Sequence, residues 1–359
     1  MSESQVKPSM GRIIDLFAGA GGLSEGFRNQ GFEIALANEF DPEIAKAYAY
    51  NHPDTPLIVD DIRNVDLHTT FGPLQDTVQV IVGGPPCQGF SQKGQRKTIN
   101  DERNYLFREF VEVVRIVTPK YFVMENVPNL LTAEGGKFRK ELEALFIKLN
   151  YRISAQVLNA ADFGVPQNRR RAIIIGKRGQ SAPDLRLTPK SASTVWDAIS
   201  DLSYLNSGEG NESSPYVTSP ETQYQEHSRT DSKTLYNHVA TRHSPIVLER
   251  LQLIPPNCTQ KVLPIEHRTK SVYSGTWTRL DSAGHAPTIT TRFDTPSSGQ
   301  FTHPYLNRAL TVREAARIQS FPDTYRFIGN KMSQMRQVGN AVPVALANAV
   351  AKSILNDLD

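Results

Sequence analysis

Short apolar runs alternate with helical patterns through the first half of the chain. Runs with the length and composition of buried strands occur at residues 13–17, 33–37, 57–59, 78–82 and 121–124, then near 153–158 and 172–176. Apolar residues recur at helical spacing over 106–117, before Pro119, and again over 138–149. Strands that alternate with helices in this way predict an α/β fold with a doubly wound, mostly parallel sheet.

The pattern changes after residue 176. Residues 207–222 are rich in Ser, Gly, Pro, Asn and Thr and are predicted to be loop, while 271–280 and 287–293 are short β-like pieces. Thr311 and Glu314 have the spacing of a capping box, which predicts a helix over 311–321. A final apolar helix is predicted to open at 337–343, to run to about 355 and to return to the first domain.

These patterns predict two domains. The first is a catalytic and cofactor-binding domain over residues 1–176, completed by the C-terminal helix within 335–359. The second, over 177–334, is smaller, irregular and β-rich. A chain of 359 residues is long enough for this division.

Composition narrows the class of protein. Residues 1–11 are polar and no stretch reads as a bilayer span, so we expect a cytoplasmic protein with no membrane contact. Only two cysteines occur, Cys87 and Cys258, which argues against a disulfide framework and against a cysteine zinc site, and we expect no metal.

Charge is unevenly distributed along the chain. Residues 1–176 carry 20 Lys and Arg against 21 Asp and Glu, whereas 177–359 carry 20 against 16 and six of the eight His. The excess suggests that the C-terminal half meets a polyanion. A solvated surface without such a partner is the alternative.

The segment at 83–91, Gly-Gly-Pro-Pro-Cys-Gln-Gly-Phe-Ser, follows a predicted buried strand. The two prolines fix φ just before Cys87, and the glycines on either side permit close approach of backbone or ligand. The pattern indicates a thiol held in one place. The alternative is a small buried apolar residue beside a turn.

The ends of the first three strands carry groups suited to an adenosine-type ligand. A glycine turn at 18–22 follows the first strand, but Ser24 stands where a dinucleotide fingerprint has its third glycine. Glu39 lies about 20 residues farther on, where an acid accepts from ribose hydroxyls, and Phe40 can lie against a base. The third strand ends in Asp60-Asp61-Ile62, where an acid can accept from an adenine amine. Each feature alone is also typical of a tight turn or a solvated loop.

Polar groups also flank the later strands. Glu125 ends the strand at 121–124, so it should face the same edge of the sheet as Cys87. Three arginines at 169–171 precede a buried strand and cannot all be buried unpaired. They meet an anion or a polar ligand, or they flank the strand as solvated charge.

Taken together, the motifs resemble those of the DNA cytosine-C5 methyltransferases of bacterial restriction-modification type. They occur in that family's order and span about residues 13 to 350, and the stretch 177–285, which matches none of them, lies where the family has its target-recognition domain. The motifs are Asp15-Leu16-Phe17-Ala18-Gly19-x-Gly21-Gly22, Pro85-Pro86-Cys87, Glu125-Asn126-Val127, Gln167-x-Arg169-x-Arg171, residues 313–322, and Gly339-Asn340-x-Val342-Pro343.

The resemblance implies a covalent mechanism on a cytosine flipped out of duplex DNA. Cys87 would add to C6, and Glu125 would hydrogen-bond N3 and the exocyclic amine. Arg171, supported by Arg169, would hold the ring carbonyl and favour the thiolate. The base that removes the C5 proton is not identified.

The resemblance also implies S-adenosyl-L-methionine as methyl donor and S-adenosyl-L-homocysteine as product. Glu39 would take the ribose, Asp61 the adenine amine, and Phe40 and Ile62 would sandwich the adenine. The implied cofactor residues are Phe17, Ala18, Gly19, Gly21, Leu23, Glu39, Phe40, Asp61, Ile62, Pro86, Leu106, Asn340 and Val342. The implied DNA-contacting residues are Gln88, Ser91, Lys93, Arg96 and Gln167.

Three other functions are weighed against this one. A nicotinamide-dependent dehydrogenase shares the glycine turn but needs no Pro-Pro-Cys loop. An RNA-directed member of the same family typically lacks a long variable recognition region, and a non-catalytic DNA-binding relative would be expected to lose Cys87 or Glu125. The expected partners are double-stranded DNA and a cognate restriction endonuclease that acts on the same site without a stable complex, with the enzyme itself a monomer.

Overall fold

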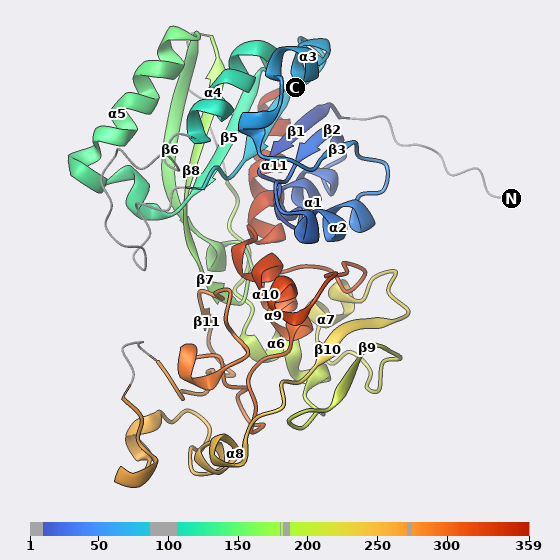
Figure 1. Ribbon diagram of the computed structural model, residues 1–359, viewed down its shortest axis with the longest axis vertical. Helices are drawn as coiled ribbons and strands as arrows, with labels where there is room; N and C mark the ends of the chain where they lie inside the picture. Colours follow the sequence, from blue (N-terminus) through green and yellow to red (C-terminus); the bar gives the residue numbers. More distant parts are fainter. Residues whose placement is uncertain (1–9, 87–105, 180, 182–186, 271–274, 359) are drawn as a thin grey trace, which may run out of the picture. The chain divides into compact units, whose positions relative to one another are not determined.

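The structure is a computed structural model in which residues 10–86, 106–179, 181, 187–270 and 275–358 are described. They pack into two compact units (Figure 1). The first unit comprises residues up to Asn159, Arg170–Thr188 and the segment from Val344, and the second comprises Ala160–Arg169 and Pro189–Pro343. The domain boundaries expected at 176 and 335 stay a prediction, because a packing unit need not be a domain that folds alone.

A seven-stranded sheet forms the centre of the first unit. Its order is β3-β2-β1-β4-β5-β8-β6; the first five strands are parallel, and β8 is antiparallel to both β5 and β6. The predicted doubly wound, mostly parallel sheet is therefore confirmed. The strands are β1 (Arg12–Leu16), β2 (Glu33–Asn38), β3 (Leu57–Ile58), β4 (Val80–Gly83), β5 (Tyr121–Asn126), β6 (Tyr151–Asn159) and β8 (Arg170–Arg178).

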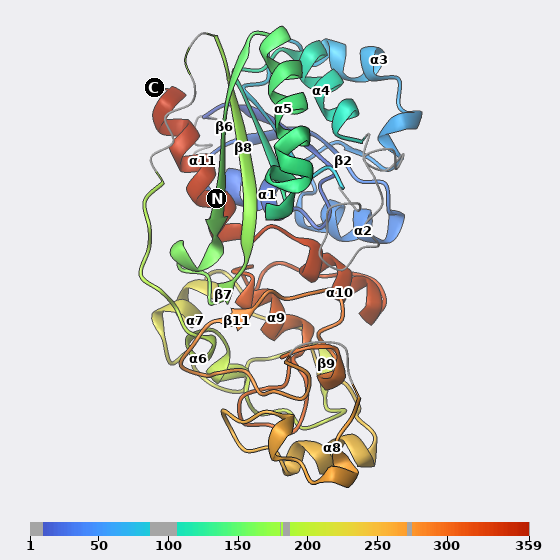
Figure 2. The same ribbon diagram turned by 90° about the vertical axis from the view of Figure 1, so that its left-hand side faces the viewer.

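Helices cover both faces of this sheet. Figure 2 shows β6 and β8 between α11 (Val344–Leu358) and α5 (Ala133–Lys148). Helices α1 (Gly22–Arg28) and α2 (Pro42–Asn51) share the face of α11, whereas α3 (Leu67–Phe71) and α4 (Leu106–Val117) share that of α5. Helix α1 packs tightly on α11, since a Cβ added at Gly26 would lie 2.4 Å from that of Ala347.

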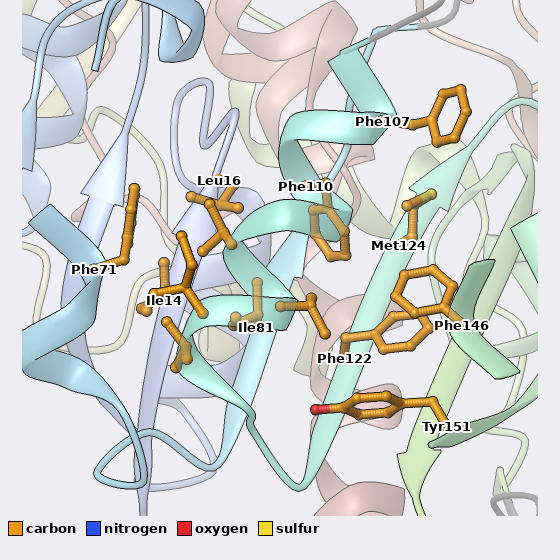
Figure 3. Close-up of a cluster of buried hydrophobic side chains, with 14 of the residues drawn as sticks. Ile14, Leu16, Phe71, Ile81, Phe107, Phe110, Phe122, Met124, Phe146 and Tyr151 are labelled. Atoms are coloured by element: carbon orange, nitrogen blue, oxygen red, sulfur yellow. The ribbon is translucent and has the colours of Figure 1, made fainter. Parts of the chain in front are cut away.

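The main apolar core lies between the sheet and the α4–α5 layer. Phe122 of β5 is its centre, stacked on Phe146 with ring centroids 3.9 Å apart and edge-on to Phe110 (Figure 3). Successive strand residues point to opposite faces, so Ile14 and Leu16 enter this core while Ile13 faces the other helix layer. Burial on both faces explains why these strands read as continuous apolar runs.

The end of the chain differs from the sequence prediction. One helix opening at 337 was expected, but α10 (Lys331–Asn340) ends before Pro343, and α11 begins as a separate helix after it. Proline cannot donate to a helical ladder and restricts the residue before it. By length and composition the stretch Lys331–Leu358 is apolar enough to cross a membrane, contrary to expectation, but 67% of its most apolar window is buried in the protein, as in a core helix.

The second unit has short elements in its described residues. Its strands pair as β10 (Leu235–Val239) with β9 (Gly210–Ser214), antiparallel, and as β11 (Ala286–Pro287) with β7 (Gln167–Asn168), parallel. Strand β9 lies in a stretch that the sequence predicts to be loop. Its residues are polar and mostly exposed, so no apolar pattern marks it as a strand. Its other helices are α6 (Val195–Ile199), α7 (Gln223–Ser228), α8 (Pro245–Gln252) and α9 (Val312–Ile318).

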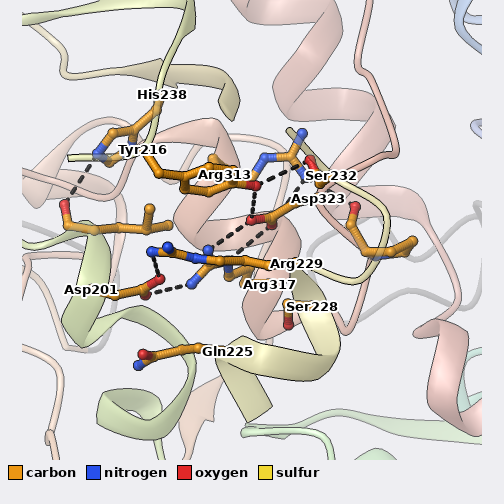
Figure 4. A network of polar contacts seen from close by, with 12 residues as sticks. Asp201, Tyr216, Gln225, Ser228, Arg229, Ser232, His238, Arg313, Arg317 and Asp323 are labelled. Atoms are coloured by element: carbon orange, nitrogen blue, oxygen red, sulfur yellow. Dashed lines mark hydrogen bonds and ion pairs between the residues drawn. The ribbon is translucent and has the colours of Figure 1, made fainter. Parts of the chain in front are cut away.

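Helix α9 begins with the predicted capping box between Thr311 and Glu314. It also carries Arg317, whose fully buried guanidinium bonds both oxygens of Asp323, at 2.9 and 2.7 Å, and Asp201 at 2.5 Å (Figure 4). Tyr216 donates to Asp323 as well. Burial alone would raise the pKa of Asp323, but the charge of Arg317 lowers it. This ion network anchors α9 in the second unit.

Candidate active site

The carboxyl ends of the parallel strands meet at one edge of the sheet in the first unit. Strand β1 has β2 on one side and β4 on the other, so the strand order reverses between β1 and β4. Ligands of open α/β sheets bind outside the strand ends at such a point. The glycine turn follows β1 and the Pro-Pro-Cys segment follows β4, so the sequence places both at this point.

The glycine turn has a backbone that few residue types adopt. Gly19 and Gly21 have φ of 59° and 92°, and Phe17 also has a positive φ of 58°. A positive φ at a bulky residue is uncommon and marks a functional or strained position. A Cβ added at Gly19 would meet no atom within 4 Å, so open space lies beside the turn.

Glu39, at the end of β2, braces this turn. Its carboxylate accepts the backbone N–H of Gly19 at 2.8 Å and that of Asp41 at 2.8 Å, and the side chain is buried. Glu39 therefore links the ends of β1 and β2 in the position where a ribose acid was predicted.

The predicted adenine contacts differ in accessibility. Phe40 is 62% exposed, whereas Ile62 is buried in the main apolar core. Asp61 is partly exposed and pairs with Arg63, whose side-chain hydrogen bond lowers the pKa of the carboxyl. Leu23 and Ala20 are buried beneath the turn, and Ala18 is partly exposed.

Ser24, which broke the dinucleotide fingerprint, has a structural role that the sequence did not reveal. Its hydroxyl donates to the Asp15 carboxylate at 2.6 Å and lies 2.7 Å from the Tyr48 hydroxyl. Asp15 is fully buried, and its Oδ1 has no hydrogen-bond partner among the described residues. Burial raises the pKa of Asp15 to about 7. These three side chains tie β1, α1 and α2 together beneath the turn.

Glu125 and Arg171 lie together at the end of β5. Arg171 Nε is 2.7 Å from Glu125 Oε1, and both side chains are mostly buried. The antiparallel register pairs Glu125 with Ile173, which places Arg171 on the same face as a diagonal neighbour. A Cβ added at Gly84 would lie 3.1 Å from Glu125 Oε2, so the glycine after β4 admits the carboxylate.

Asn126 holds the segment that leads to the predicted nucleophile. Its buried side-chain amide donates to the carbonyl of Pro85 at 2.8 Å and accepts the N–H of Val127 at 2.9 Å. Pro86 is partly exposed at the end of this segment. Cys87, Gln88, Ser91, Lys93 and Arg96 lie outside the described residues; Leu106, the first residue of α4, is partly exposed.

Four predicted site residues belong to the second unit. Gln167 and Arg169 are buried there, and their side chains form hydrogen bonds with its backbone. Asn340 is exposed at the end of α10, and Val342 is buried. Their relation to the residues of the first unit stays a prediction.

The mostly parallel seven-stranded sheet matches the fold of S-adenosylmethionine-dependent methyltransferases. A family model described as C-5 cytosine-specific DNA methylase matches residues 11–356. The chain therefore belongs to the C-5 cytosine-specific DNA methylases.

Individual relatives support this membership. The type II methyltransferase M.DdeI of Desulfomicrobium norvegicum is 38% identical over 370 residues, which cover 95% of this chain and 88% of that protein. M1.HphI of Haemophilus parahaemolyticus is 38% identical over 346 residues, covering 95% and 86%.

Solved structures of similar proteins have the same fold. A DNA modification methyltransferase encoded within an Escherichia coli prophage has a TM-score of 0.78 at 28% identity, covering 97% of this chain and 99% of that one. The Entamoeba histolytica methyltransferase EhMeth, at 16% identity with a TM-score of 0.63, covers 98% of this chain and 100% of its own and supports the fold alone.

Proposed function

We propose that this enzyme methylates C5 of a cytosine flipped out of duplex DNA, with Cys87 as the covalent nucleophile, and that it is the modification enzyme of a restriction-modification system. The Glu125–Arg171 pair carries the proposal. It sets a carboxylate and a guanidinium side by side, with the carboxylate against Gly84, three residues before Cys87. These are the two groups that a cytosine needs along its N3 and carbonyl edge.

The chemistry explains why a thiol is required. C5 of cytosine is a weak nucleophile, and addition of the Cys87 thiolate to C6 converts the ring into an enamine. The electron pair at C5 then attacks the methyl carbon, and the bond from that carbon to the donor sulfur breaks. Loss of the C5 proton to a base and expulsion of the thiolate restore the ring and free the enzyme.

Glu125 and Arg171 act on the charge that develops during this addition. Glu125 accepts from the exocyclic amine and donates a transiently held proton to N3, which distinguishes cytosine from thymine. Arg171 donates to the ring carbonyl and raises the local positive potential, which favours the thiolate. Both side chains are mostly buried, so their electrostatic effect is larger than in water.

The residues at the ends of β1 to β3 fit S-adenosyl-L-methionine. Open space lies beside Gly19, the ring of Phe40 is exposed, and the Glu39 carboxylate stands at the end of β2, where an acid accepts from ribose hydroxyls. The bound group supplies an electrophilic methyl. Asp61, Ile62, Leu23, Pro86, Leu106, Asn340 and Val342 are proposed to complete the site, and no metal is needed for this chemistry.

DNA is proposed to meet two parts of the chain. The segment 88–103, with Gln88, Ser91, Lys93 and Arg96, is proposed to close over the DNA. Residues 177–285 are proposed to read the target sequence. The enzyme is proposed to act as a cytoplasmic monomer beside a nuclease that cuts the same site.

Methyl transfer from labelled S-adenosyl-L-methionine to duplex DNA, to tRNA and to no acceptor tests this function. Incorporation into duplex DNA alone is the expected result. Incorporation into tRNA alone would identify an RNA-directed relative, and no incorporation in a folded protein would identify a non-catalytic one.

A further inference from the structure

Gln167 and Arg169 belong to a buried cluster that joins four separate segments of the second unit. Strand β7 supplies Gln167, and Arg169 follows it directly. The other segments are 286–290, the end of α9 at Ile318–Gln319, and the last turn of α10. Gln167, Arg169 and Gln319 are each at most 1% exposed.

Ile289 is held through both of its backbone groups. Its N–H donates to the side-chain carbonyl of Gln167 at 2.8 Å, and its carbonyl accepts Nη1 of Arg169 at 3.0 Å. The side-chain amide of Gln167 in turn donates to Gln319 at 3.0 Å. The segment carrying Ile289 is thereby fixed against β7.

The same side chains end α10. The last carbonyls of a helix have no intrahelical partner, and cations near them are stabilising. Nη2 of Arg169 donates to the carbonyl of Gly339 at 2.9 Å, and Gln319 donates to that of Val338 at 2.6 Å. A Cβ added at Gly339 would lie 2.4 Å from the carbonyl oxygen of Thr290, so the helix end sits directly on the segment that Ile289 anchors.

We propose that Arg169 is a positioning residue that sets the end of α10, and with it the cofactor residues Asn340 and Val342, rather than a group that supports the ring carbonyl. This inference rests on the proposed function, because it takes those two residues as part of the cofactor site. Arg169 reaches two carbonyls on different segments with two nitrogens of one planar group. A lysine, which is a single point donor, cannot span both.

Arg279 provides a matched control. It is also buried in the second unit, and it donates to backbone carbonyls at the end of another helix, α8, including Leu251 at 2.8 Å and Ile254 at 2.6 Å. Arg169→Lys and Arg279→Lys therefore remove the same kind of contact from two helix ends. The proposed cofactor residues Asn340 and Val342 lie at the helix end that Arg169 holds, and not at the one that Arg279 holds.

The experiment measures the Kd of S-adenosyl-L-homocysteine by calorimetry and amide hydrogen exchange over residues 337–342, in the wild type and both variants. Arg169→Lys should raise the Kd about ten-fold and speed exchange in that segment, whereas Arg279→Lys should lower the melting temperature without either change. Gln319→Met, which removes the bond to Val338, should act in the same direction as Arg169→Lys and serves if Arg169→Lys fails to fold.

An unchanged Kd in folded Arg169→Lys, with only a lower melting temperature, would overturn the inference. An equal rise in Kd for Arg279→Lys would overturn it as well, since the effect would then be general. Wild-type protein that binds no S-adenosyl-L-homocysteine would contradict the proposed function instead. In that case only the comparison of amide hydrogen exchange at 337–342 between the wild type and Arg169→Lys would test whether Arg169 positions the end of α10.

Discussion

The guanidinium Nε of Arg171 lies 2.7 Å from the Glu125 carboxylate, on neighbouring antiparallel strands that end at the candidate site. Because both side chains are mostly buried, removal of either partner leaves the other charge poorly compensated. Breaking the pair should therefore lower the stability of the fold as well as remove its proposed catalytic role. Experiments on the pair must measure stability and catalysis separately.

Glu125→Gln should lower kcat by about a hundred-fold or more, because the amide cannot transfer a proton to N3. The Kd for S-adenosyl-L-homocysteine should change little, since Glu125 is not a proposed cofactor residue. Single-turnover methylation and calorimetry measure the two quantities. A fall in cofactor affinity with unchanged turnover at saturation would contradict the assigned role.

Gly84→Ala should disturb the same carboxylate from the opposite side. Its Cβ would lie 3.1 Å from Glu125 Oε2, so the carboxylate must move by a few tenths of an ångström, and kcat should fall with a small loss of stability. Gly72→Ala is the control, because a Cβ there meets nothing within 4 Å. Gly83→Ala, 2.5 Å from the carbonyl oxygen of Leu16, should instead lower the unfolding temperature. Equal kinetics for Gly84→Ala and Gly72→Ala would count against the proposed fit.

Asn126→Asp should weaken the hold on the loop that leads to Cys87. The substitution replaces the donor to Pro85 with an acceptor, so two oxygens would face each other in a buried place, at a cost of about 1–3 kcal/mol. We expect slower reaction of Cys87 with cytosine in the single-turnover assay. Limited proteolysis within 88–103 checks the loop, and an unchanged cleavage rate with unchanged turnover would contradict the positioning role.

The raised pKa of Asp15 predicts that the free energy of unfolding depends on pH. Burial raises its pKa from 3.8 in the unfolded chain to about 7 in the folded protein. The folded state then holds a proton that the unfolded state releases, so this contribution is full below the unfolded pKa, declines as pH rises towards about 7, and is level above it. The slope is at most about 1.4 kcal/mol per pH unit.

Asp15→Asn removes this titration and keeps an acceptor for Ser24. Urea unfolding of both proteins at several pH values should show the wild type losing stability relative to Asp15→Asn as pH rises to about 7, with a constant difference above that. Parallel curves throughout would show that Asp15 does not titrate in this range.

Much of the fold was predictable because it follows from apolar pattern. Strands buried on both faces read as unbroken apolar runs, and the capping box at Thr311 and Glu314 is a local signal. Strand β9 was missed because its residues are polar and exposed, and the break between α10 and α11 was missed because alanines and valines continue across it. These features depend on packing partners rather than on the local sequence.

The site was predictable where a motif names its residues and not where residues act through others. The acid at the end of β2 and the carboxylate at the end of β5 follow from strand position. The bond from Ser24 to Asp15, the hold of Asn126 on Pro85 and the contact of Arg169 with Gly339 depend on which segments meet in three dimensions. No spacing in the sequence reveals them.

A duplex carrying 5-fluorocytosine at the target position tests the central claim most directly, because fluorine at C5 leaves no proton to remove and the addition product persists. With S-adenosyl-L-methionine present, mass spectrometry of the digested complex should locate the adduct on Cys87. Cys87→Ser should form none and should bind S-adenosyl-L-homocysteine within a few-fold of the wild type. An adduct on Cys258, or turnover by Cys87→Ser, would contradict the account.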